Sequence, residues 1–123
     1  MDTARRRLLF VCSRNRLRSP TAEKIFGRTP GLAVRSRGLS ASAVRRLSAD
    51  DVEWADVIFV MEPDQKKQLL RAFRDQATGR PIQVLDIPDE YGFMDPELVA
   101  LITAGVEAVL AADGRDDEGR GEG

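Results

Sequence analysis

The sequence predicts an α/β protein built on a four-stranded parallel sheet with helices on both faces. Short apolar segments of strand length alternate along the chain with segments whose apolar residues recur at helical spacing. The clearest strand, residues 56–61 (DVIFVM), holds five consecutive apolar residues, as expected when both faces of a parallel sheet are covered. Because strand and helix alternate throughout, we expect right-handed crossovers and a parallel sheet.

Two strands and two helices are expected in the first half of the chain. In order, they are a strand over residues 7–12, a helix over 19–27, a strand over 32–36 and a helix that begins near residue 48. Ser19 has the chemistry of an N-cap, Pro20 suits the first helical position and Gly27 ends the helix. Gly38 breaks the chain after the second strand.

The second half of the chain repeats the pattern. Its predicted elements are the strand over 56–61, a helix over 62–78, a strand over 81–87 and a last helix that begins after residue 95. Asp95 followed by Pro96 marks the start of that last helix. Residues 113–123 contain no apolar side chain, so we expect one folded domain over residues 1–112 and a disordered acidic, glycine-rich tail.

The composition limits the classes of function. Nineteen basic and 20 acidic residues give a net charge of −1, so we expect neither a nucleic-acid nor a membrane partner. The single cysteine excludes an internal disulfide and indicates a cytoplasmic protein. The absence of histidine excludes Ser-His and Cys-His catalysis and most zinc sites. We therefore expect neither a metal nor a cofactor. Any general acid–base catalysis must use Asp, Glu, Lys, Tyr or Cys.

Cys12 is the first candidate catalytic residue. A lone cysteine in a strand most often serves as a small apolar side chain. Cys12, however, ends its predicted strand and precedes a helix N-terminus, and its loop also carries Arg14, Arg16 and Arg18. Each of these features favours a reactive thiolate. Since ligands of parallel sheets bind beyond the carboxyl ends of the strands, a thiolate there can attack phosphorus and form a phosphocysteine.

The same loop, residues 12–18, has the residues of a phosphate site, and we name it the Cys12 loop. Arg18 stands six positions after Cys12. If the loop curls back, the planar guanidinium of Arg18 can face the thiol and bind two phosphate oxygens. Asn15 tolerates the left-handed conformation that a nest of backbone N–H groups requires. Ser19 serves as the helix N-cap, as a hydroxyl donor to the Cys12 sulfur, or as both.

A phosphatase mechanism also needs a general acid, which the Cys12 loop lacks. The loop after the fourth predicted strand offers four carboxylates: Asp86, Asp89, Glu90 and Asp95. Asp95 already has a structural role as a helix N-cap, and Asp86 ends the strand, which is also a catalytic location. Geometry decides among them, because the acid must reach the leaving oxygen.

The string CSRNRLRSP, residues 12–20, resembles the signature C-x-x-N-x-x-R-S-P of the low-molecular-weight protein tyrosine phosphatases. Residues 36–38 (SRG) resemble the S-A-G segment after the second strand of that family, and residues 56–61 resemble its third strand. Residues 89–91 (DEY) lie where the family has D-P-Y. The resemblance covers about residues 8–112 and implies the family's fold, with the phosphatase loop after the first strand.

The resemblance implies a role for several residues. Cys12 matches the nucleophile, Arg18 the phosphate-binding arginine and Asp89 the general acid, with Asp86 as the alternative acid. The residues matched to phosphate or substrate binding are Ser13, Arg14, Asn15, Arg16, Leu17, Ser19 and Tyr91. Among these, the backbone amides of the loop hold the phosphoryl oxygens, the asparagine and the serine shape the loop, and Tyr91 forms an aromatic wall of the cleft.

The implied activity is hydrolysis of phosphotyrosine, an aryl phosphomonoester, through a phosphocysteine intermediate and without a metal. The expected partner is a phosphorylated protein or a small aryl phosphate, and the sequence leaves the oligomeric state open. Three alternatives use the same loop. They are a phosphoarginine phosphatase, an arsenate reductase that relies on an external thiol, and a phosphate- or phosphopeptide-binding module that has lost turnover.

Three positions depart from the family pattern. Leu17 stands near the place where the family often has a second cysteine. A protective disulfide with Cys12 is therefore excluded, and we expect peroxide to oxidise Cys12 irreversibly. Arg16 replaces a small or apolar residue that helps line the cleft, so its charge is expected to affect the choice of substrate. Glu90 replaces the proline of D-P-Y.

Overall fold

The computed structural model describes the backbone of residues 5–122 and the side chains of residues 5–112. Its elements, in chain order, are β1 (Arg6–Cys12), α1 (Arg18–Phe26), β2 (Leu32–Gly38), α2 (Ala49–Trp54), β3 (Val57–Val60), α3 (Pro63–Ala72), α4 (Arg74–Ala77), β4 (Ile82–Val84) and α5 (Pro96–Glu122). The strands form one four-stranded parallel sheet in the order β2-β1-β3-β4. The predicted sheet is thereby confirmed.

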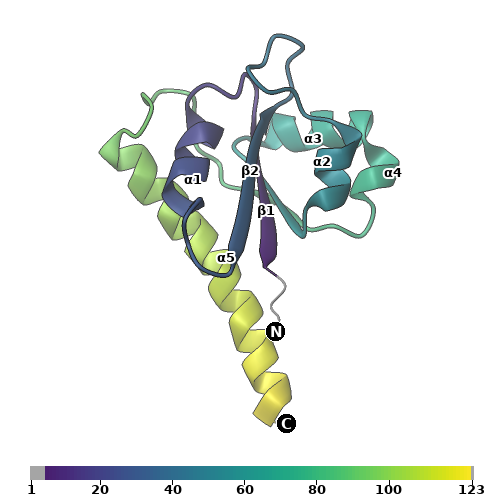
Figure 1. Ribbon diagram of the computed structural model, residues 1–123, viewed down its shortest axis with the longest axis vertical. Coiled ribbons are helices and arrows are strands. Elements are labelled where there is room, and N and C mark those ends of the chain that lie inside the picture. Colours follow the sequence, from purple (N-terminus) through teal and green to yellow (C-terminus); the bar gives the residue numbers. More distant parts are fainter. Residues whose placement is uncertain (1–4, 123) are drawn as a thin grey trace.

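Helices cover both faces of this sheet, as predicted (Figure 1). α1 and α5 lie on one face, and α2, α3 and α4 lie on the other. β1 lies between β2 and β3, so the Cys12 loop leaves the sheet from the middle of its carboxyl edge. In the register, Cys12 is paired with Gly38, and Val11 is paired with Val60. A ligand site in a parallel sheet is expected at this place.

The side chains of β1 and β3 point alternately to the two faces and are buried on both. Every residue of 8–11 and of 57–60 is at most 2% exposed. Toward α1 and α5, the Phe10 ring stacks on Phe26 and Phe59, with ring centroids 6.0 and 5.1 Å apart. The alternate residues pack toward α2, α3 and α4 in a second cluster. Burying one such side chain is worth about 1.5–3 kcal/mol, so these clusters fix the strand that carries Cys12.

The predicted helix over residues 62–78 is two helices. Phe73 leaves the helical conformation, with φ −133° and ψ 43°, between α3 and α4. Leu69 and Ala77, on the two sides of this break, are both buried in the second cluster, so the bend keeps the apolar face of both helices on the core. The last strand, β4, is also shorter than the predicted 81–87, because its ladder with β3 covers only residues 82–84.

α5 begins as predicted and continues further than predicted. Asp95 Oδ1 accepts the Glu97 N–H at 2.8 Å, which is the N-cap bond expected of Asp95. The helical backbone continues to Glu122, and its last turns extend past the sheet (Figure 1). This differs from the disordered tail expected for residues 113–123, whose side chains lie outside the described part of the chain. A domain boundary at residue 112 stays a prediction.

No helix within residues 5–122 combines the length and the apolar character needed to cross a membrane.

Candidate active site

The Cys12 loop is anchored by its carbonyl groups. Three successive loop carbonyls accept hydrogen bonds from the segment after β2: Leu39 N to Cys12 O (3.0 Å), Ser40 N to Ser13 O (2.8 Å) and Val44 N to Arg14 O (3.0 Å). Because these carbonyls face that segment, the N–H groups on the opposite side of the same peptides, those of Ser13, Arg14 and Asn15, turn to the inner side of the loop. Among the described residues, no acceptor is bonded to the amides of Ser13, Arg14, Arg16 or Leu17. They form a nest that suits an anion.

Gly38 allows β2 to approach this loop. A Cβ atom at position 38 would lie 2.8 Å from the Ser13 carbonyl oxygen and 3.0 Å from the Arg14 carbonyl carbon. Both are backbone atoms, so they could move away only if the loop itself moved. The glycine of the SRG segment is therefore required for space, and a larger residue would push the nest out of shape.

Two groups hold the Cys12 sulfur. The Asn15 N–H donates to Sγ at 3.2 Å, and the Ser19 hydroxyl lies 3.0 Å from Sγ. Asn15 has the predicted left-handed conformation, with φ 56°, which directs its N–H back to the sulfur. With the Ser19 hydroxyl as donor, both contacts stabilise negative charge on the sulfur. Cys12 itself is only 3% exposed.

The expectation that Ser19 caps α1 is wrong. The helix begins at Arg18 with Leu17 as its N-cap residue, and no side chain caps it. Pro20 consequently occupies the third helical position, where a missing N–H still costs nothing. The Ser19 hydroxyl contacts the Cys12 sulfur and accepts a hydrogen bond from Asn15 Nδ2 at 2.9 Å. Of the two roles predicted for Ser19, only that of a hydroxyl donor to Cys12 remains.

A polar network that runs from buried Asn15 and Ser36 to exposed Arg45 fixes the Asn15 side chain behind the loop. Asn15 Nδ2 also donates to Ser36 Oγ at 3.0 Å, and Asn15 Oδ1 accepts from Arg45 Nε at 3.3 Å. Arg45 Nη2 donates to Glu23 Oε1 at 2.6 Å, and the Ser36 hydroxyl donates to the same oxygen at 2.7 Å. Sequence reasoning assigned no role to Ser36, Arg45 or Glu23, because they come from three separate parts of the chain. Only the serine of the SRG segment could have pointed to this network.

The Glu23 carboxylate makes that network sensitive to acid. Burial raises the pKa of Glu23, but hydrogen bonds from Arg45 and Ser36 outweigh burial and hold the pKa below its ordinary value of 4.5. A lowered pKa means that the ionised form stabilises the fold above about pH 4.5 and that this stability is lost as pH falls through the folded-state value. We expect Glu23→Gln to lower the free energy of unfolding by about 1 kcal/mol at neutral pH.

Urea unfolding of both chains at neutral pH and near pH 3 measures this effect. The difference between the chains should shrink at the lower pH, because protonated glutamate then resembles glutamine. A difference of the same size at both pH values would show that the charge of Glu23 contributes nothing.

Arg18 reaches from the start of α1 to the loop after β4. Its side chain is buried, and Nη1 donates to the Ile87 carbonyl at 2.7 Å and lies 3.2 Å from Glu62 Oε2. Its Nε lies 3.8 Å from Asp89 Oδ1. These contacts fix the plane of the guanidinium group. Nη2 has no partner among the described residues, so it is available for a phosphate oxygen.

Glu62 and Gln65, at the start of α3, are site residues that sequence reasoning missed. Gln65 is 1% exposed, and its Oε1 accepts the N–H groups of Met61 and Glu62 at 2.9 and 3.0 Å. Its Nε2 donates to Ser13 Oγ at 3.3 Å, which joins α3 to the Cys12 loop. Both residues follow the third predicted strand and so lie at the same sheet edge as Cys12. This position was the signal in the sequence that could have identified them as site residues.

A cavity of about 480 Å³ lies over the Cys12 loop. The residues that line it are Cys12, Ser13, Arg14, Arg16, Leu17, Arg18 and Asp89. It therefore brings together the expected nucleophile, the expected phosphate-binding arginine and one expected acid, while Asn15 and Ser19 lie buried beneath them. Within the described residues, no group of three or more His, Cys, Asp or Glu side chains is placed to hold a metal ion.

Asp86, Glu90 and Tyr91, which the sequence also offered as site residues, do not line that cavity. Asp86, in a left-handed conformation with φ 60°, lines a separate hollow beside Glu62. The Tyr91 ring packs against the core, and its hydroxyl donates to Glu97 Oε2 at 3.4 Å. Burial, followed by the charge of Glu97, raises the pKa of Tyr91. In this structure Tyr91 does not form the aromatic wall that the resemblance implies.

Solved phosphatase structures share this fold. Against the arginine phosphatase YwlE from Geobacillus stearothermophilus, the TM-score is 0.69 at 22% identity, covering 89% of this chain and 96% of that one. Against the tyrosine phosphatase Wzb from Escherichia coli K30, it is 0.68 at 19% identity, covering 83% and 94%. Against SP-PTP, a low molecular weight protein tyrosine phosphatase from Streptococcus pyogenes, it is 0.66 at 21% identity, covering 87% and 92%.

No protein-family model matches the chain, and no curated protein matches it in sequence. The likeness to solved structures, at these identities, shows the fold. The chain has the fold of the low-molecular-weight protein tyrosine phosphatases, as the CSRNRLRSP string implied.

Proposed function

We propose that this chain, which has the fold of the low-molecular-weight protein tyrosine phosphatases, is a cysteine-dependent phosphatase that hydrolyses phosphotyrosine and related aryl phosphomonoesters. One observation carries the proposal: Cys12, Arg18 and Asp89 line a single cavity whose floor is a nest of unbonded amides. A nucleophile, an anion site and an acid in one cavity are the parts that phosphoryl transfer through a covalent intermediate requires.

The first step forms a phosphocysteine. The Cys12 thiolate attacks phosphorus while the bond from phosphorus to the aryl oxygen breaks. The Asp89 carboxyl gives its proton to the departing oxygen, so the product leaves as a neutral phenol. Arg18 and the loop amides bind the three equatorial oxygens, on which negative charge is spread in the transition state.

The second step regenerates the enzyme. The Asp89 carboxylate takes a proton from a water molecule, and the water oxygen attacks phosphorus as the sulfur–phosphorus bond breaks. Inorganic phosphate is released, and the sulfur leaves as a thiolate stabilised by the Asn15 N–H and the Ser19 hydroxyl. The polar network that fixes Asn15 keeps these donors in place through both steps.

Phosphoarginine is the alternative substrate, because the fold is also that of an arginine phosphatase. Its leaving group carries a guanidinium, whereas the cavity is lined by three arginines and one carboxylate. Like charges repel one another in a partly desolvated site. Charge repulsion therefore favours the aryl phosphate over phosphoarginine.

A substrate panel tests the proposal. We expect the purified chain to hydrolyse phosphotyrosine at least about tenfold faster, in kcat/KM, than phosphoserine or phosphoarginine. Phenol is a better leaving group than the serine hydroxyl, and it lacks the positive charge of the arginine leaving group. Activity should persist in EDTA, since no step uses a metal. Cys12→Ser protein is the control for contaminating phosphatases. Phosphoarginine as the best substrate would contradict the proposed specificity, and binding of phosphate without any turnover would leave a binding module.

A further inference from the structure

The side chains of two arginines of the Cys12 loop take no part in the two proposed steps, in which these residues contribute only their backbone amides. Arg14 and Arg16 are exposed and line the cavity. Neither guanidinium forms an ion pair or hydrogen bond with another described residue. The other arginine of the loop, Arg18, is buried against Glu62 and the Ile87 carbonyl. The loop therefore presents two uncompensated positive charges beside the site where phosphate would bind.

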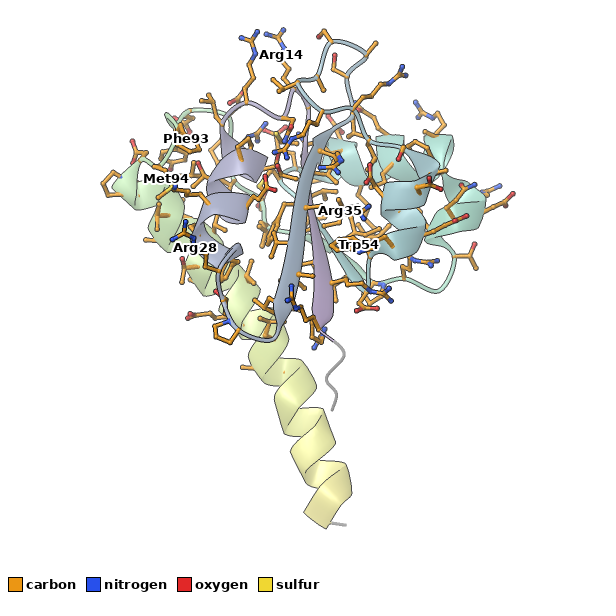
Figure 2. All side chains as sticks on the ribbon, viewed as in Figure 1. Arg14, Arg28, Arg35, Trp54, Phe93 and Met94 are labelled. Atoms are coloured by element: carbon orange, nitrogen blue, oxygen red, sulfur yellow. The ribbon has the colours of Figure 1, made fainter. Side chains whose placement is uncertain are left out.

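The backbone places these two side chains on the outer side of the loop. Asn15, between them, is 2% exposed and directs its side chain inward to Ser19 and Ser36. Its left-handed conformation turns the chain so that both neighbours remain exposed. Figure 2 shows Arg14 at the end of the molecule where the Cys12 loop lies, with its side chain directed away from the body of the protein. Such a group can contact the part of a substrate that stays outside the cavity.

The charges of the cavity indicate which kind of chemical group these arginines bind. Three arginines face one carboxylate, that of Asp89, and Asp89 lies near Arg18 at 3.8 Å. The amide nest and Arg18 serve the phosphoryl group, so Arg14 and Arg16 remain for a second anionic group. A guanidinium binds a carboxylate through two parallel hydrogen bonds, and exposed arginines also attract acidic ligands over distance.

We propose that Arg14 and Arg16 bind acidic side chains next to the phosphotyrosine, so that the chain prefers acidic phosphopeptides. This inference rests on the proposed function of the site. The cavity opens at the surface, and the two arginines on its edge are in reach of residues that flank a bound phosphotyrosine. The second anion is thus supplied by the peptide, and a small aryl phosphate without one gains nothing from these side chains.

The test compares three phosphotyrosine peptides that differ only in the two residues beside the phosphotyrosine. Both of these residues are glutamate in the first peptide, glutamine in the second and lysine in the third. At low ionic strength, we expect kcat/KM to be roughly tenfold higher for the glutamate peptide than for the lysine peptide, mainly through KM. High salt should reduce this ratio. In the double variant Arg14→Gln/Arg16→Gln the ratio should fall to within about twofold of unity.

The double variant Arg71→Gln/Arg74→Gln is the matched control, because it also removes two positive charges. Arg71 and Arg74 are exposed arginines that line a different hollow, together with Leu70, so their replacement removes the same charge elsewhere on the surface. The variant should keep the full glutamate-to-lysine ratio. Equal kcat/KM for the three peptides, or a preference that the double variant retains, would overturn the inference.

A binding measurement separates this inference from the proposed function. Cys12→Ser protein is titrated with the glutamate and lysine phosphopeptides, and fluorescence anisotropy gives the two dissociation constants. A chain that turns over no substrate contradicts the proposed function, but tighter binding of the glutamate peptide that depends on Arg14 and Arg16 still supports the acidic preference. Equal binding of the two peptides, or no binding of either, overturns it.

Discussion

Replacing Cys12 with serine should abolish turnover of an aryl phosphate, with a fall in kcat of roughly 10⁴-fold or more. A serine hydroxyl at this position is a poor nucleophile, because no histidine is present to take its proton. The amide nest and Arg18 remain in place, so inorganic phosphate or vanadate should still bind. Steady-state kinetics with p-nitrophenyl phosphate and calorimetric titration with vanadate measure the two effects.

Two outcomes of the Cys12→Ser experiment have different meanings. Near wild-type turnover would exclude a covalent intermediate on Cys12. Loss of both turnover and anion binding would instead indicate that the variant loop has collapsed. Cys12→Ala, which removes the hydrogen bond between position 12 and Ser19, then tests whether the nest survives without that contact.

Replacing Asp89 with alanine should slow poor leaving groups much more than good ones. A phenolate with a low proton affinity departs without a proton, so p-nitrophenyl phosphate should lose less than about tenfold in kcat. Phosphotyrosine needs the proton, and we expect a loss of roughly 10²-fold or more. A plot of log kcat against leaving-group pKa should therefore become steeper in the variant.

Asp86→Ala is the matched control for this assignment. It removes a carboxylate from the same loop, but Asp86 lines a separate hollow beside Glu62 and not the cavity that holds Cys12. We expect its leaving-group dependence to match that of the unchanged chain. The steeper plot in Asp86→Ala, with a normal plot in Asp89→Ala, would show that the acid is Asp86.

The fold could be predicted because its determinants are local. The continuous apolar strands at residues 8–11 and 57–60 are buried on both faces, and their pattern alone requires helices on each side. The break at Phe73 was not predictable in the same way. It follows from the packing of α3 and α4 against one cluster, which a helical period along residues 62–78 does not reveal.

The candidate site likewise has a part that local sequence predicts and a part that depends on tertiary packing. The residues of the Cys12 loop are close in sequence, so a single string identifies Cys12, Asn15 and Arg18. The groups that hold them, such as Glu62 behind Arg18 and Arg45 behind Asn15, approach only when distant elements pack together. Ser19 shows the limit of local rules: its chemistry suits an N-cap, but the adjacent sulfur and Asn15 engage its hydroxyl.

The bonds from Leu39, Ser40 and Val44 to the loop carbonyls link the site to the edge of the sheet, where β2 has a neighbouring strand on one side only. Edge strands open locally at a lower free energy than central ones. If β2 detached, the loop carbonyls would be released and the amide nest would lose its orientation. An anion in the cavity must then stabilise the closed edge by mass action and slow hydrogen exchange of the Leu39, Ser40 and Val44 amides. If the chain binds substrate as proposed, binding and the local unfolding of one strand would thus be a single coupled equilibrium.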